Sequence, residues 1–333
     1  MSASVLERAR AGDGQAFREL VAPHTAELRV HCYRMLGSLS DADDLLQETL
    51  TAAWRGLAGF AGRSSLRAWL YAIATNRCLN AIRAEKRRPP AEPVPPFDPT
   101  EPSRRGEVTW LQPYPDTWLP HDAAPGPAAR YTARESVELA FVAALQTLPA
   151  RQTAALLLCD VLGFATAEAG AMLGTTPTAV KGALQRARAS LDRSRTADGG
   201  PAPRPGSAAE RDLARRFAEA FSADDIDGVV ALLTDDAWLA MPPAPHEYHG
   251  RAAIAGFLRA SAAWRGRRRM RLVPARANGR PAFGCYIADP EGAEATVPAG
   301  LLVLTPYGTR IGAITRFLDG DLPRVFGLTA PNA

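Results

Sequence analysis

Apolar side chains recur at helical spacing over much of the chain. The pattern runs from residue 14 to residue 88, and a proline-rich stretch at residues 89–96 ends it. The chain then stays irregular to Pro127, and helical spacing returns from about Tyr131 to Arg195. This pattern predicts two small all-helical domains joined by a linker.

The last third of the chain has a mixed pattern. It follows a second break of glycines and prolines at residues 199–206, and it opens with amphipathic helical segments around Leu213–Phe221 and Val229–Leu233. Three runs of strand-forming residues come next: Ala282–Ile287, Val297–Thr305 and Arg310–Leu318. We therefore expect an α+β domain in this region.

A chain of 333 residues exceeds one ordinary domain, and the breaks predict a multidomain protein. The predicted units are, in chain order, an all-α domain at residues 1–90, a linker at 91–134, a second all-α domain at 135–196, a short linker at 197–207 and the α+β domain at 208–329.

Positive charge is concentrated in the first domain. The formal net charge of the chain is only +4, but residues 1–90 hold thirteen Lys and Arg against nine Asp and Glu. Such a local excess favours specific contacts with phosphates over the coating of a long polyanion. Nearly every cation is Arg, which we attribute chiefly to the Ala-, Pro- and Gly-rich composition.

Cysteine spacing and hydropathy exclude several classes of protein. The four cysteines lie far apart and lack the spacing of metal ligands, so we expect no metal site, no disulfide framework and no cofactor. No apolar run approaches the roughly twenty residues of a membrane span. Met1–Arg10 carries charges where a signal peptide has an apolar core. We expect a cytoplasmic protein without membrane insertion.

A cluster of acidic residues marks the start of one helix in the first domain. Ser40 fits the N-cap position, and Asp43 fits a capping box three residues later. The cluster holds more acid than a helix start requires, which favours a docking face for a basic partner; stabilisation of the helix start alone is the alternative. The candidate binding residues are Asp41, Asp43, Asp44, Leu45, Gln47 and Glu48.

The next predicted helix has two unlike faces. Leu66, Leu70, Ala74, Cys78 and Ile82 recur every four residues and predict its packing face. The other face presents amides and guanidinium groups, which meet base edges and phosphates in complexes with nucleic acid. A solvated helix is the alternative. The candidate DNA-binding residues of this helix are Trp69, Asn76, Arg77, Asn80, Arg83 and Arg87.

A short loop with one aromatic residue and two hydroxyls precedes that helix. Such a loop can hold an unpaired base, because stacking on a protein aromatic contributes about 1–3 kcal/mol per base. An ordinary turn is the alternative. The candidate residues are Phe60, Arg63, Ser64 and Ser65.

The second domain contains the pattern of a helix-turn-helix. A helix predicted over Thr166–Leu173 ends at Gly174, and Thr176 and Pro177 fit the N-cap and first turn of the next helix. In this motif the N-terminal part of the second helix enters the major groove, although any amphipathic helical hairpin can imitate the pattern. The candidate DNA-binding residues are Thr176, Thr178, Lys181, Gln185, Arg186 and Arg188.

These segments resemble the extracytoplasmic-function (ECF) sigma factors of bacterial RNA polymerase, over about residues 14–90 and 135–192. Asp43–Thr49 is similar to the helix that binds the polymerase clamp, Trp69–Arg77 to the helix that reads the −10 element, and Val180–Arg188 to the −35 recognition helix. The resemblance implies core RNA polymerase and promoter DNA as partners, with an anti-sigma factor as a further candidate. Asn80 and Gly182 depart from the usual Asp and polar residue, so the promoter sequence stays open.

The linker and the tail resemble those of ECF sigma factors with a C-terminal SnoaL-like domain. The similarity rests on the aromatic tract at residues 109–120 and on Ala277–Phe283 in the tail. It implies an α+β cone with one curved sheet. A free linker of this length would average roughly 40 Å, short of the roughly 60 Å between promoter elements. We therefore expect the polymerase to fix the spacing and to bind the aromatic tract.

A cone of this type can enclose an apolar pocket, although core packing is the alternative role for its aromatic residues. The candidate lining residues are Trp238, Met241, Tyr248, Phe283, Tyr286 and Phe317. His246 and His249, with Asp235 and Asp236, show no spacing that fixes a catalytic pair. The basic run Arg265–Arg271 fits either a solvated strand edge or a contact with nucleic acid or polymerase. A cone-domain isomerase or cyclase-like enzyme, or a ligand sensor, fused to DNA-binding helices is the competing class.

Overall fold

The structure, a computed structural model, describes residues 3–85, 95–105, 111–119, 137–194, 203–288 and 296–330. The chain forms two compact units. One combines residues 1–90 with 118–196, and the other combines residues 91–117 with 197–333. The predicted linker is therefore divided, and its first part belongs to the C-terminal unit.

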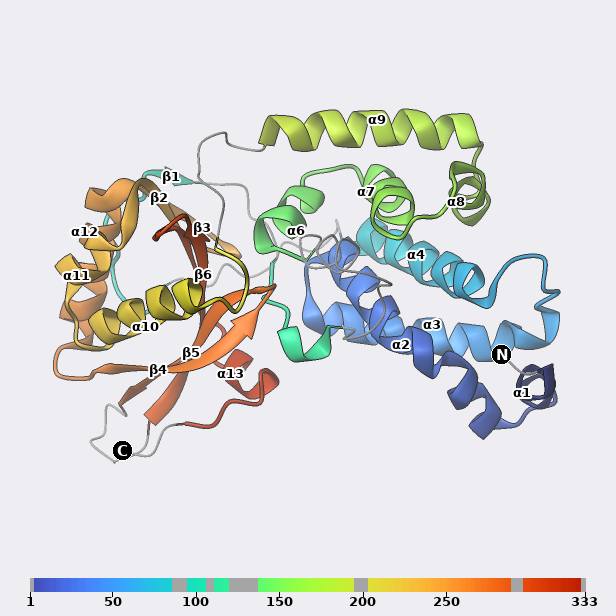
Figure 1. Cartoon of the computed structure of the whole chain (residues 1–333), viewed down its shortest axis with the longest axis horizontal. Coiled ribbons are helices and arrows are strands. Elements are labelled where there is room, and N and C mark those ends of the chain that lie inside the picture. The colour runs from blue at the N-terminus through green and yellow to red at the C-terminus, as the bar shows by residue number, and fades with distance from the viewer. Residues whose placement is uncertain are drawn as a thin grey trace. The chain divides into compact units, whose positions relative to one another are not determined.

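In its described residues, the first unit is all-helical, as predicted (Figure 1). Its α-helices are α1 (Ala3–Arg10), α2 (Gly14–Leu36), α3 (Leu39–Gly56), α4 (Leu66–Glu85), α6 (Leu139–Gln146), α7 (Ala150–Leu156), α8 (Thr166–Leu173) and α9 (Pro177–Ser194). The predicted packing face of α4 is confirmed over most of its length, because Leu66, Leu70, Ala74 and Cys78 are buried, whereas Ile82 near the end of the helix is half-buried.

The N-cap of α3 differs from the predicted one. The helix begins at Leu39, and the Ser38 hydroxyl accepts a hydrogen bond from the backbone N–H of Asp41 at 3.2 Å. Ser40 is already inside the helix. Both serines have the hydroxyl that an N-cap requires. Gly37 ends α2 in the left-handed conformation, so the chain turns directly before Ser38, and α3 starts there.

A buried histidine lies in the core between α2 and α4. His31 Nε2 is 2.9 Å from the Thr75 hydroxyl, and its ring contacts Tyr71 edge-on at 5.1 Å. Burial lowers the pKa of His31 to about 3, and the positive charges of Arg34 and Arg67 act in the same direction. The imidazole is therefore neutral in the folded domain at physiological pH.

This histidine predicts a loss of stability in mild acid. Below pH 6.5 the unfolded chain binds a proton at His31 that the folded domain does not, so the free energy of unfolding falls as pH falls from 6.5 toward 3. At pH 5 we expect a loss of about 2 kcal/mol from this group. His31→Gln should remove that contribution, which urea unfolding at pH 7 and pH 5 measures. An equal loss in wild type and variant would contradict the prediction.

The second unit contains one seven-stranded sheet, in the order β1-β3-β2-β7-β6-β5-β4. Its strands are β1 (Arg104–Arg105), β2 (Leu233–Met241), β3 (Ala244–His249), β4 (Met270–Ala277), β5 (Arg280–Ala288), β6 (Thr296–Tyr307) and β7 (Arg310–Phe317). Neighbouring strands are antiparallel except β2 and β7, which are parallel.

Three helices cover the inner face of this sheet: α10 (Ala208–Ser222), α11 (Ile226–Ala231) and α12 (Gly250–Arg265), as Figure 1 shows. Phe217 of α10 and Phe257 of α12 join one apolar core with inward strand residues such as Leu239 and Ile314. The short helix α13 (Leu322–Val325) follows the last strand. The predicted α+β class is confirmed.

The linker residues 95–105 and 111–117 are held by this unit at two places. In the segment 95–105, β1 pairs with β3 at one edge of the sheet, and Arg104 forms an ion pair with Glu247 at 2.8 Å. In the segment 111–117, the Tyr114 N–H donates to Asn278 Oδ1 at 2.7 Å, and the Asn278 N–H donates to the Tyr114 carbonyl at 2.9 Å. Part of the linker, including residues 111–117 of the aromatic tract that we expect to bind polymerase, is thus held by the α+β domain.

Asn278 and Gly279 form the two-residue turn between β4 and β5. Both have positive φ, 55° and 75°, which an Asn-Gly hairpin turn requires and which most side chains disfavour. Asp116 caps the arrangement, because its Oδ1 accepts from the Gly279 N–H at 2.7 Å and its Oδ2 accepts from Arg276 Nε at 3.2 Å. The hairpin turn is therefore also the anchor of the linker.

Candidate nucleic-acid and polymerase interface

The acidic face predicted in the first domain lies on α3. Asp44, Gln47 and Glu48 are exposed, whereas Leu45 is buried and serves the core. Asp41 and Asp43 are half-buried, and Asp43 forms an ion pair with Arg29 of α2 at 2.7 Å. The exposed part of the predicted polymerase-binding set is thus one stripe along the middle of the helix.

The loop before α4 holds its aromatic residue inside. Phe60 is 8% exposed, and its ring lies 5.0 Å from that of Trp69. Arg63, Ser64 and Ser65 are exposed, and the Ser65 hydroxyl accepts from the Ala68 N–H at 3.1 Å, which caps α4. In this conformation the Ser and Arg side chains of the loop are open to solvent, whereas the Phe60 ring is not.

The exposed face of α4 carries the predicted amides and guanidinium groups. Asn76, Asn80 and Arg83 are exposed, and Arg77 is half-buried and pairs with Glu48 of α3 at 2.9 Å. Arg87 lies outside the described residues. The predicted polymerase-binding and −10 residues are therefore neighbours, joined by the Arg77–Glu48 pair.

The helix-turn-helix packs against α4. The Asn76 side-chain amide donates to the Met172 carbonyl of α8 at 3.0 Å. Arg67 of α4 lies over two rings, those of Tyr71 and Phe164, each at 4.9 Å, and its Nε donates to Glu27 at 3.1 Å. Arg67 and Phe164 were not among the predicted site residues, since nothing in their local pattern indicates a contact between domains.

The predicted turn between α8 and α9 is confirmed. Gly174 ends α8 with a φ of 61°, and the Thr176 hydroxyl accepts from the Ala179 N–H at 3.2 Å. Gly170 allows the turn to approach α8, because a Cβ there would lie 3.0 Å from the Thr175 carbonyl oxygen. These local constraints fix the start of α9, the end that the motif directs toward DNA.

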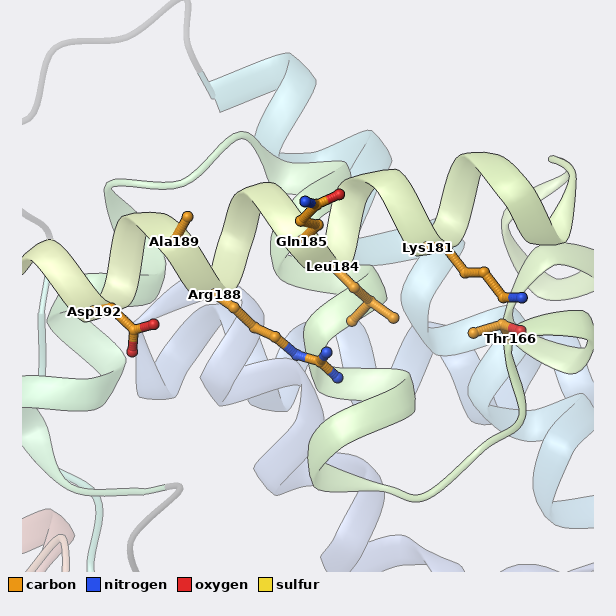
Figure 2. Close-up of a pocket in the computed structure, with 7 residues that line it drawn as sticks. All are labelled: Thr166, Lys181, Leu184, Gln185, Arg188, Ala189 and Asp192. Atoms are coloured by element: carbon orange, nitrogen blue, oxygen red, sulfur yellow. The ribbon is translucent and has the colours of Figure 1, made fainter.

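The predicted contact residues form one exposed face of α9. Thr176, Thr178, Lys181, Gln185, Arg186 and Arg188 are all exposed, whereas Val180, Leu184 and Ala187 are buried. Figure 2 shows Lys181, Gln185 and Arg188 beside an open groove of about 430 Å³, which Thr166 at the start of α8 also lines. The face offers an ammonium, an amide and guanidinium groups to a single partner.

Arg188 is held by Asp160, which was not among the predicted site residues. Its Nε and Nη2 donate to the two oxygens of Asp160, at 2.9 and 2.7 Å. This pairing raises the pKa of Arg188 and fixes the direction of its side chain. The remaining N–H groups of the guanidinium are the ones that can meet a phosphate.

The α+β domain contains a cavity of about 330 Å³. None of the six predicted lining residues lines it. Met241, Tyr248 and Phe283 belong to the apolar core on the inner face of the sheet. The other three predicted residues lie on the outer face of the sheet, because side chains alternate along a strand and the residues next to them face inward: Trp238, Tyr286 and Phe317. The cavity is lined instead by residues such as Phe97, Phe257, Trp264 and Arg316.

The polar residues considered for catalysis do not line this cavity either. His249 stacks on Trp238 with ring centroids 4.3 Å apart, and Asp235 pairs with Arg251 at 2.9 Å. In the described part of the chain, no group of His, Cys, Asp and Glu side chains could hold a metal ion. The basic run is divided, because Arg265 is buried against Asp224 at 2.6 Å, whereas Arg271 lies on β4, the edge strand.

Three protein-family models match the chain. Sigma-70 region 2 matches residues 20–88, Sigma-70, region 4 matches residues 138–191, and the SnoaL-like domain matches residues 214–305. The region 2 match contains α3 and α4, and the region 4 match contains α8 and most of α9. The architecture is therefore that of a sigma-70-type factor with an added α+β domain.

Curated relatives make the family more specific. The ECF RNA polymerase sigma factor SigG of Mycobacterium tuberculosis is 43% identical over 322 residues, 96% of this chain and 85% of that protein. SigM of the same species is 30% identical over 192 residues, 58% of this chain and 83% of that protein. The chain belongs to the ECF RNA polymerase sigma factors, the alternative sigma factors of promoter recognition.

A solved structure has the same fold over most of the chain. The crystal structure of the Mycobacterium tuberculosis ECF sigma factor SigJ matches with a TM-score of 0.59 and 20% identity, covering 91% of this chain and 97% of that one. Among the described residues, no helix combines the length and apolarity needed to cross a membrane.

Proposed function

We propose that this sigma factor binds core RNA polymerase through the acidic stripe of α3 and promoter DNA through α4 and α9. The observation that carries the proposal is the face of α9, where a capped helix start and a row of exposed DNA-compatible side chains coincide. Lys181 and Arg186 suit phosphates, and Gln185 suits a base edge. Asn76, Asn80 and Arg83 supply the equivalent groups on α4.

The contact between α4 and α8 constrains this function. Asn76 donates to a carbonyl of α8, so one of the proposed −10 residues is engaged by the domain that reads the −35 element. Promoter elements roughly 60 Å apart cannot be reached while the two helices touch. We infer that polymerase binding separates them, and that the free chain binds promoter DNA weakly.

The α+β domain has a regulatory rather than a catalytic role in this proposal. Its support is the linker, which joins the two promoter-reading domains and is bound by Asn278 and by the edge of β3. Holding or releasing this segment changes the length of free chain between the domains. We place the protein in the cytoplasm, where RNA polymerase works; an anti-sigma factor is a further candidate partner.

Reconstituted transcription tests the function. Adding the full chain to sigma-free bacterial core polymerase should yield promoter-specific transcripts from a library of candidate promoters. Deleting residues 208–333 should change their amount, and unchanged transcription would count against the regulatory role. Absence of specific transcripts from every promoter in the library would favour the enzyme or ligand-sensor alternative.

Substitutions on α9 separate affinity from sequence reading. Gln185→Ala should weaken holoenzyme binding to its promoter by about 1–3 kcal/mol and relax selection at one −35 position, because a base-edge contact is lost. Lys181→Ala should weaken binding to all sequences alike and lower the salt dependence. Gel-shift titrations over a randomised −35 element measure both effects. Arg151→Ala, an exposed change on α7, is the control.

A further inference from the structure

The cavity of the α+β domain has an apolar wall with one buried cation. Phe221 of α10, Phe257 and Trp264 of α12, and Leu302 of β6 are among its apolar lining residues. Its volume of about 330 Å³ falls in the range of small-molecule pockets, roughly 300–1,000 Å³. Such a wall removes an apolar ligand from water, which is the main source of affinity in pockets of this kind.

The cation is Arg316, on the inner side of β7. It is 9% exposed, and its Nη2 donates to the Ala299 carbonyl at 2.6 Å. Its Nη1 is buried and has no hydrogen-bond partner among the described residues. A guanidinium removed from water without a carboxylate is costly, so this arrangement is expected only where another group completes it.

A second buried arginine of the same domain shows the usual solution. Arg265 is 4% exposed, and its Nη2 pairs with Asp224 at 2.6 Å. The ion pairs found in the described part of the chain include this one but none for Arg316. Arg265 also has donors without a hydrogen-bond partner among the described residues, its Nε and Nη1, so the two arginines differ in charge balance rather than in unused donors. Arg316 lines the cavity without an acidic partner, whereas Arg265 lies outside it and is paired with Asp224.

We propose that the cavity binds a small molecule with one carboxylate on an apolar body, and that the carboxylate is bound by Arg316. The planar guanidinium suits a carboxylate better than other anions of one charge, because its parallel N–H groups match the two oxygens. Ser261 also lines the cavity and offers a hydroxyl. Fatty acids and aromatic acids share this chemistry, and the test distinguishes them by shape.

The linker forms part of the same wall. Pro95, Pro96 and Phe97 line the cavity, and the Phe97 ring lies 5.6 Å from that of Phe257 and 5.8 Å from that of Trp264. A ligand that contacts Phe97 favours the docked linker, and by linkage the docked linker favours the ligand. The site stands independently of the proposed regulatory role, since binding is measured without polymerase.

Calorimetric titration of the full chain tests the site. We expect saturable binding of at least one acid among hexanoate, octanoate, decanoate and 1-naphthoate, and at least tenfold weaker binding of the matching alcohol. The preference between the straight and the aromatic acids identifies the shape of the apolar body. If none of these acids binds, or if acid and alcohol bind equally, the proposal is wrong.

Three variants assign the carboxylate to Arg316. Arg316→Met removes the charge but keeps an unbranched apolar side chain, and it should weaken the acid at least tenfold while leaving the alcohol unchanged. Arg324→Met, which changes an exposed side chain of α13, is the matched control and should bind like the wild type. Phe97→Ala should weaken acid and alcohol by similar factors. Undiminished acid binding by folded Arg316→Met, checked by circular dichroism, would overturn the assignment.

Discussion

Reversing the charge of the acidic stripe on α3 should strongly weaken the association of this sigma factor with core polymerase. In the double variant Asp44→Lys and Glu48→Lys, two exposed carboxylates become ammonium groups. Like charges facing each other at an interface cost several kcal/mol, so we expect binding to weaken about a hundredfold or more. Co-elution with core polymerase at low salt and fluorescence anisotropy measure this loss.

The variant should nevertheless fold. Among the described residues, the variant loses one ion pair, that of Arg77 with Glu48, and an exposed pair of this kind contributes about 0–1 kcal/mol. A matched control reverses two exposed acids of the α+β domain, Glu219→Lys and Asp227→Lys. If both double variants bind polymerase like the wild type, α3 is not the docking face.

Removing the anchor of the linker should release residues 111–117. Asn278→Gly keeps the positive φ of the hairpin turn but deletes the acceptor for the Tyr114 N–H, and Asp116→Ala deletes the acceptors for Gly279 and Arg276. Three hydrogen bonds at about 1 kcal/mol each correspond to a change of roughly a hundredfold in the opening equilibrium. Hydrogen exchange of this segment in the full chain should accelerate by that factor.

The double variant, Asn278→Gly with Asp116→Ala, also tests regulation by the α+β domain. If the held linker limits the separation of the promoter-reading domains, its release should change transcript yield several-fold with wild-type polymerase. Thr117→Ala, an exposed change in the same segment, is the control. Accelerated exchange with unchanged transcription would support the anchor and argue against the regulatory role.

Local signals allowed the helical part to be predicted closely. The bounds of α8 and the start of α9 follow from Gly174, Thr176 and Pro177, each of which acts within one turn of chain. The N-cap of α3 was misplaced by two residues because Ser38 and Ser40 carry the same chemistry, and the preceding turn decides between them. The contact of α4 with α8 has no local signal and required the structure.

The α+β domain was predicted less completely. Strands β5, β6 and β7 coincide with the predicted apolar runs. In β2 the polar residues Thr234, Asp235 and Asp236 interrupt the apolar pattern, β3 is rich in polar residues, and β4 begins within a basic run. The predicted pocket residues do not line the cavity, and the reason is a different one. Side chains alternate between the faces of a sheet, so Phe317 and Arg316, adjacent in sequence, point to opposite faces. The signal for the cavity was Arg316, which lies between Ile314 and Leu318 on the same face of the chain.

The pairing of β1 with β3 has a consequence for synthesis of the protein. Arg104 leaves the ribosome 143 residues before Glu247, its partner across the two strands. At roughly 5–20 residues per second, the segment waits about 7–30 s for its docking site to be made. During that interval the nascent chain exposes both promoter-reading domains on an untethered segment, and a ribosome that stops early releases a permanently unrestrained form.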